Sequence, residues 1–122
     1  MTEEIKKGSL GISVKAHETI VNLVYDGNEP SQDRPFVSIV EGFRFAFALG
    51  YSKSIHSKKT GKHVTVAPRQ FVVDDYLEIL REEAISKDQS LGGLISEYAE
   101  AGCIELGKIV INGDTVMNVL NL

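Results

Sequence analysis

A chain of 122 residues, 43% hydrophobic and 25% charged, is long enough to bury a core of its own and has too little net charge and too much apolar content to be disordered. Its one cysteine, Cys103, excludes an intramolecular disulfide and a cysteine-based metal cluster, which favours a reducing compartment. The N-terminal residues contain no apolar h-region, so we expect no secretory signal, and no apolar run approaches the roughly 20 residues of a membrane helix. We expect one cytoplasmic domain over residues 1–122, with a frayed polar lead at 1–11, and no membrane contact.

The first half of the chain predicts a short extended piece at 12–14 and two helices. The first helix, over about 16–26, has an apolar face and a stop at Gly27, and a turn-rich loop follows it. The second begins with Ser38 and Glu41, which form an S-x-x-E capping box before an aromatic run. The alternating phenylalanines of this run would also suit a strand, but the capping box favours a helix. We expect Gly50 to end it in the left-handed conformation.

The second half predicts three more helical pieces. Asp74 is placed to cap a helix over 74–88, and Ser90 to cap the segment that follows it. Gly102 and Gly107 are expected to break or bend that segment. A turn at Gly113 then precedes a short helix at the C-terminus. The sequence therefore predicts a mainly α single-domain fold of four or five helices, with one short β-hairpin inserted at about 52–67.

The stretch 51–70 is basic within an acidic chain. The net charge of the whole chain is −4, yet this stretch contains no Asp or Glu. The rest of the chain contains eight basic residues and all seventeen acidic ones, so its net charge is −9. A hairpin turning at Gly61 would gather lysines at an exposed tip, where they suit phosphate groups better than base edges. The candidate nucleic-acid-binding residues are Lys53, Lys58, Lys59, Lys62 and Arg69. The alternative is a solvated loop whose lysines keep the hairpin soluble.

No signature of catalysis, nucleotide hydrolysis or metal binding accompanies this stretch. A phosphate-binding loop would need glycine at position 56, where His56 stands, and Ser or Thr after Lys62. The three histidines have no metal-ligand spacing. Cys103 lies between two glutamates, which disfavours a thiolate, so we interpret it as a small buried hydrophobe. The adjacent pairs Asp74/Asp75 and Glu82/Glu83 are interpreted as a solvated face. We expect no catalytic residue, no cofactor and no metal.

Three stretches together resemble a known family. "ISVKAHETIVNLVYDG", "PFVSIVEGFRFAFALGY" and "EYAEAGCIELGKIV", in this order and with the basic segment between the last two, resemble the Dnd system-associated protein 4 family. These are small accessory proteins of gene clusters that replace a non-bridging phosphate oxygen of DNA with sulfur, or restrict DNA lacking that mark. The resemblance covers about residues 12–111. Where the family is richer in arginine after the Gly-Tyr pair, this chain has lysine and histidine.

The resemblance implies a non-catalytic accessory subunit of a prokaryotic DNA phosphorothioation or restriction defence system. Such a subunit would contact the DNA backbone through the basic hairpin, or another subunit of the system through the acidic helix 74–88. The alternative function is a protein-interaction adaptor with no direct nucleic-acid contact, and a small enzyme with an unrecognised site is a third hypothesis. The apolar content also leaves room for a homo-oligomer.

Overall fold

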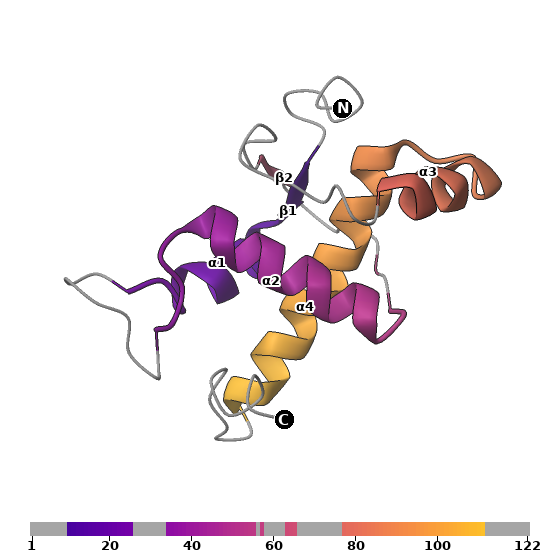
Figure 1. Cartoon of the computed structure of the whole chain (residues 1–122). Helices are drawn as coiled ribbons and strands as arrows, with labels where there is room; N and C mark the ends of the chain where they lie inside the picture. Colours follow the sequence, from indigo (N-terminus) through magenta and orange to yellow (C-terminus); the bar gives the residue numbers. More distant parts are fainter. Residues whose placement is uncertain (1–9, 26–33, 56, 58–62, 66–76, 112–122) are drawn as a thin grey trace.

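The computed structural model describes residues 10–25, 34–55, 57, 63–65 and 77–111 (Figure 1). Within these residues the chain forms four helices and two short strands. In chain order they are β1 (Gly11–Ser13), α1 (Val14–Val21), α2 (Ile39–Ser52), β2 (His63–Thr65), α3 (Leu77–Ser86) and α4 (Leu91–Ile111). The predicted mainly α class is confirmed.

The core lies where α2 crosses α4 (Figure 1). α2 buries Phe43, Ala46 and Phe47 in the same core as Leu94 and Ile95, which lie near the N-terminal end of α4 and are fully buried. α1 and β1 pack on the same central helix, β2 pairs with β1, and α3 packs near the N-terminal end of α4 (Figure 1). Because α4 contacts every other helix and β1, its residues 94–103 are almost all buried.

Glycines allow the backbones of α2 and α4 to touch. A Cβ atom at Gly102 would lie 1.8 Å from the carbonyl oxygen of Ala46, and one at Gly50 would lie 2.1 Å from the carbonyl oxygen of Tyr98. No real side chain tolerates such distances, so these positions are glycine for reasons of packing. The predicted helix stop at Gly50 is therefore wrong. α2 continues to Ser52, and the left-handed residue is Ser54, with φ of 54°.

A break of the last long helix at Gly102 or Gly107 is also wrong, since α4 is continuous over Leu91–Ile111. Glycine lowers helix propensity by about 1 kcal/mol per residue, but packing of an apolar helix outweighs such a cost. At Gly102 the helix gains close packing against the backbone of Ala46. The low helix propensity of glycine, taken alone, does not predict that contact.

The predicted helix starts are confirmed at two places. The Ser38 hydroxyl accepts a hydrogen bond from the backbone N–H of Glu41 at 3.2 Å, and the Glu41 carboxylate accepts one from the N–H of Val37 at 3.2 Å. The Ser90 hydroxyl accepts from the N–H of Gly93 at 3.0 Å. The first predicted helix is present, but its bounds differ from the prediction. It covers Val14–Val21 instead of 16–26, because Ser13 caps it.

The β-hairpin expected at about 52–67 differs in its partner strand. β2 lies within this range, but it pairs antiparallel with β1, with Ile12 opposite Val64. The residues just before the expected turn bond elsewhere. The N–H of Ile55 donates to Gly50 at 2.9 Å, and that of Ser57 donates to Glu97 at 3.0 Å. β2 therefore pairs with β1, which is distant in the sequence, and not with the residues just before it that the hairpin prediction required.

Several predictions fall at the edges of the described residues. The lead predicted to be frayed at 1–11 reaches too far, because Leu10 is fully buried and Gly11 belongs to β1. Asp74 and the C-terminal helix lie outside the described residues, as does the expected hairpin turn at Gly61. The helix predicted over 74–88 is observed as α3 over Leu77–Ser86.

Two glycine-to-alanine substitutions in α4 should have opposite effects. Gly102→Ala should lower the free energy of unfolding by about 2–3 kcal/mol, because the new methyl group meets the backbone of α2. Gly107→Ala, the matched control, should raise it by about 0.5–1 kcal/mol, because its Cβ meets nothing nearer than the Thr19 hydroxyl at 4.0 Å. Urea unfolding measures both. A Gly102→Ala protein as stable as the parent would contradict the close crossing.

Candidate functional site

Lys53 is the one residue of the predicted basic site that the structure describes. It caps the C-terminus of α2, its side chain is 51% exposed, and its ammonium group lies 3.5 Å from the Glu105 carboxylate on α4. At this exposure and distance the ion pair contributes little to stability. The other predicted residues lie outside the described residues: Lys58, Lys59, Lys62 and Arg69.

Both ends of the stretch 58–62 are fixed to the body of the protein. Before it, the backbone of Ser57 donates to the carbonyl of Glu97 on α4 at 3.0 Å. After it, β2 pairs with β1, and the Gly11 N–H of β1 donates to the hydroxyl of Ser96 at 3.0 Å. Five residues that include three lysines therefore lie, in the sequence, between two attachments to α4, one made directly by Ser57 and one made by β2 through β1.

A buried carboxylate joins β1 and α1 to α4. Glu100 is only 5% exposed. One of its oxygens accepts a hydrogen bond from the Ser13 N–H at 2.8 Å, and the other accepts one from the Ser13 hydroxyl at 2.6 Å. The Ser13 hydroxyl in turn accepts from the N–H of Ala16 at 3.2 Å, which caps α1. The negative charge thus lies near the N-terminus of α1, where the helix dipole stabilises it.

A cavity of about 430 Å³ opens beside this carboxylate, between α1 and α4. Glu100 and Cys103 contribute to its lining from α4, with Ile104 beside them. Two lysines, Lys15 of α1 and Lys108 of α4, also line it. The cavity therefore combines one buried negative charge with two exposed positive ones.

Cys103 is a buried hydrophobe, as the sequence predicted. It is 1% exposed, and burial, with a smaller contribution from the Glu100 charge, raises the pKa of its thiol to about 12. A thiol with such a pKa is a poor nucleophile at neutral pH. Among the described residues, no group of three or more His, Cys, Asp or Glu side chains is arranged to hold a metal ion.

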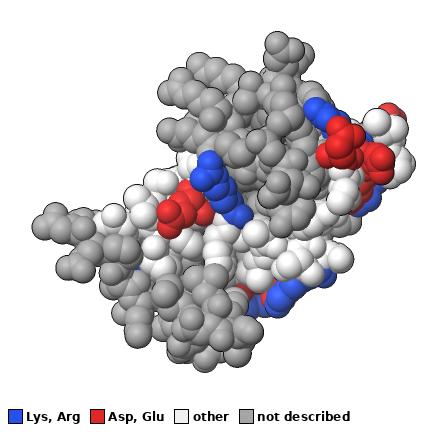
Figure 2. All heavy atoms as spheres, viewed as in Figure 1, with Lys and Arg blue, Asp and Glu red and all other residues white. Residues whose placement is uncertain are grey.

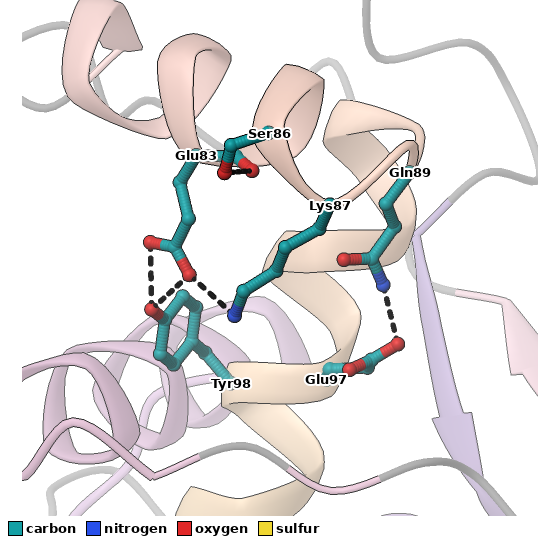
Figure 3. Close-up of polar contacts among 6 residues, drawn as sticks. All are labelled: Glu83, Ser86, Lys87, Gln89, Glu97 and Tyr98. Atoms are coloured by element: carbon teal, nitrogen blue, oxygen red, sulfur yellow. Dashed lines mark hydrogen bonds and ion pairs between the residues drawn. The ribbon is translucent and has the colours of Figure 1, made fainter.

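A second polar cluster holds α3 on α4 (Figure 3). The Tyr98 hydroxyl lies 2.6 Å and 2.8 Å from the two oxygens of Glu83, and the Lys87 ammonium lies 2.8 Å from one of them. Burial first, and then the hydrogen bond to Glu83, raise the pKa of Tyr98 well above its ordinary value. Gln89 also bonds to Glu97. The prediction of a solvated Glu82/Glu83 face is therefore wrong for Glu83, which is half-buried, while Glu82 is exposed.

The buried polar residues at β1 were not predicted from the sequence. Ser96 and Glu100 are four residues apart on α4 and both bond to β1, at Gly11 and Ser13. A signal was present, since this i, i+4 polar pair interrupts an otherwise apolar helix face. Only the position of β1 shows that the pair accepts backbone hydrogen bonds.

Comparisons of the chain with protein-family models, with curated proteins and with solved structures found no match. In the part of the chain that the structure describes, no helix is both long enough and apolar enough to span a membrane.

Two serine caps provide a test of the buried carboxylate. Ser90→Ala should lower the free energy of unfolding by about 1 kcal/mol, the usual cost of losing an N-cap. Ser13→Ala should cost about 3 kcal/mol, because it removes a cap and also a hydrogen bond to the buried charge of Glu100. Denaturant titration measures both. Equal losses would show that the Ser13 hydroxyl contributes nothing to Glu100.

Cys103 should resist alkylation in the folded protein. Raising the thiol pKa from 9.0 to about 12 lowers the thiolate fraction about a thousandfold, and burial blocks access as well. Because the folded pKa is the higher one, the neutral thiol stabilises the fold fully below pH 9, and this contribution is lost as the pH rises towards 12. Mass spectrometry after iodoacetamide treatment at about pH 8, near the ordinary thiol pKa, with and without urea, measures the protection. Equal rates in both conditions would contradict it.

Proposed function

We propose that this protein is a non-catalytic accessory subunit of a prokaryotic DNA phosphorothioation or restriction system, and that it contacts the DNA backbone. The observation that carries the proposal is the basic stretch 51–70, five Lys or Arg residues without one acidic residue in a chain of net charge −4. The resemblance to the Dnd system-associated protein 4 family supplies the biological context. Both rest on the sequence.

The anchoring of the stretch is consistent with contact to phosphates. Lysines 58, 59 and 62 lie between Ser57, which is bonded to α4, and β2, which is paired with β1. A short connection between two fixed points keeps its charges close together, and clustered ammonium groups attract a phosphate backbone without reading its bases. Affinity from such contacts falls steeply with salt.

Three Ser or Cys side chains in the described core carry a group that could serve as a nucleophile, and each has another role, which supports a non-catalytic protein. The Ser96 hydroxyl accepts from the Gly11 N–H and so holds β1 on α4. The Ser13 hydroxyl donates to Glu100 and accepts from Ala16, so it acts as a cap and a clamp. The Cys103 thiol is buried, and its pKa is raised to about 12.

The second candidate function is a protein-interaction adaptor, and the outer face of α3 supports it. Ile79 and Ile85 are 55% and 78% exposed, with the exposed Glu78 and Glu82 on the same face of the helix. Acidic side chains gather over α3, at the right of Figure 2. An exposed face that combines apolar and acidic residues suits a partner with a basic, partly apolar surface.

A pair of charge reversals separates the two functions. Lys58→Glu/Lys59→Glu should abolish binding to duplex DNA, because it places negative charges against the phosphates. The parent protein should bind at about 50 mM salt, and its affinity should fall steeply as salt is added. Fluorescence anisotropy with a labelled duplex measures both.

The matched control is Lys15→Glu/Lys108→Glu. It makes the same change in net charge on α1 and α4, at two lysines with exposed side chains. This variant should still bind DNA. If both double variants lose binding equally, net charge and not the basic segment drives association. If the parent protein does not bind duplex DNA at low salt, DNA contact is refuted and the adaptor function is favoured.

A further inference from the structure

One glycine of α4 has no packing partner that requires it. A Cβ atom at Gly107 would meet only the Thr19 hydroxyl, at 4.0 Å, whereas one at Gly102 would collide with α2. Glycine inside a helix costs about 0.5–1 kcal/mol relative to alanine, a cost visible as reduced unfolding stability. Among the described residues, the structural effect of Gly107 is to leave open one wall of the cavity between α1 and α4.

The buried end of that cavity presents a carboxylate with acceptor capacity left over. Each oxygen of Glu100 accepts one hydrogen bond from Ser13, whereas an ionised carboxylate can accept about four in all. None of the salt bridges among the described residues includes Glu100, although charges this deeply buried are normally paired. The N-terminus of α1 supplies a partial positive charge beside this carboxylate.

The other lining residues are two lysines and an apolar wall. Lys15 is exposed, and no hydrogen bond or ion pair of its ammonium group is present among the described residues. The Lys108 ammonium group lies 3.4 Å from the Glu105 carboxylate, and its side chain is 64% exposed. Ala16 and Ile104 supply the apolar surface between them. A cavity of about 430 Å³ lies within the usual range of small-molecule sites.

We propose that this cavity binds a small amine that also carries an acidic group, an amino-acid-like zwitterion. Its ammonium group would donate to Glu100, and its acidic group would lie near Lys15 and Lys108. A simple anion would be repelled by the buried carboxylate, and a simple cation by the two lysines. A ligand with both charges satisfies the lining, and its short carbon chain matches the apolar wall.

The test uses the full chain and ligands that differ in one charge. β-Alanine and γ-aminobutyrate are the zwitterionic probes, because they separate the amine and the acid by different lengths. Butyrate lacks the amine, and butylamine lacks the acid. In a heteronuclear NMR titration up to about 10 mM, above the roughly 1 mM dissociation constant of a weak complex, at least one zwitterion should shift the amide signals of α1 and α4 around the cavity. Butyrate and butylamine should bind at least tenfold more weakly, since each loses a charge-assisted hydrogen bond.

Variants at Gly107 test the location without disturbing the fold. Gly107→Leu fills the cavity from α4 and should abolish binding, while Gly107→Ala leaves most of the space and should retain it. Glu100→Gln removes the buried charge and should weaken binding at least tenfold. Glu100 also holds β1, so loss of binding in Glu100→Gln counts only if the dispersed amide spectrum shows that the variant is folded. If it is not folded, the two Gly107 variants decide the question.

Three results would overturn the inference. They are the absence of shifts around the cavity with either zwitterion, equal binding of butyrate or butylamine, and binding that survives Gly107→Leu in a folded protein. The inference does not depend on contact with DNA. Gly107→Leu changes no charge and should leave the affinity for duplex DNA unaltered, so failure of one proposal is distinguishable from failure of the other.

Discussion

The close crossing of α2 over α4 is the constraint on which the rest of the structure depends. Carbonyl oxygens of Ala46 and Tyr98 approach glycines of the opposite helix so closely that no side chain fits between them. This approach brings the aromatic residues of α2 against α4. Tyr98 lies at the centre: its backbone touches Gly50, its ring packs edge-on against Phe47 and Tyr51, and its hydroxyl bonds to Glu83 of α3. One residue of α4 thereby connects the helix crossing, the aromatic cluster and α3.

The position of α4 at the centre explains why its polar residues are engaged inside the fold. Ser96 and Glu100 accept hydrogen bonds from β1, and the Glu97 carbonyl accepts one from Ser57. A buried polar group without a partner is costly, so the two side chains hold β1 in place, and the Glu97 carbonyl holds Ser57, the residue before the lysines at 58 and 59. Because β1 is held in this way, it is available to pair with β2. The fold thus holds the two residues that flank 58–62 on one helix, Ser57 directly and His63 through β1.

Local patterns in the sequence predicted what depends on neighbouring residues. Ser38 and Ser90 cap their helices because an N-cap needs only residues three positions away. Gly50 and Gly102 were misinterpreted because glycine ends a helix in isolation, and only the second helix shows that it serves packing. The pairing of β1 with β2 joins residues 50 positions apart, which no local pattern specifies. The basic stretch 51–70 was recognised by its charge alone. Of its five predicted contact residues, the structure describes Lys53.

Contacts on α4 also affect whether the lysines of an acidic protein pair with its own carboxylates or can bind a partner. Electrostatic attraction would draw lysines onto acidic residues of α4, and Glu97 lies at the anchored Ser57, whose N–H binds its carbonyl oxygen. The Glu97 carboxylate is already engaged by Gln89, and the Glu105 carboxylate by Lys53 and Lys108. An engaged carboxylate gains less from a further ammonium group than one in contact only with solvent. For the proposed DNA contact, the consequence is that these internal hydrogen bonds and ion pairs leave phosphates less competition from α4 for the lysines of the basic stretch.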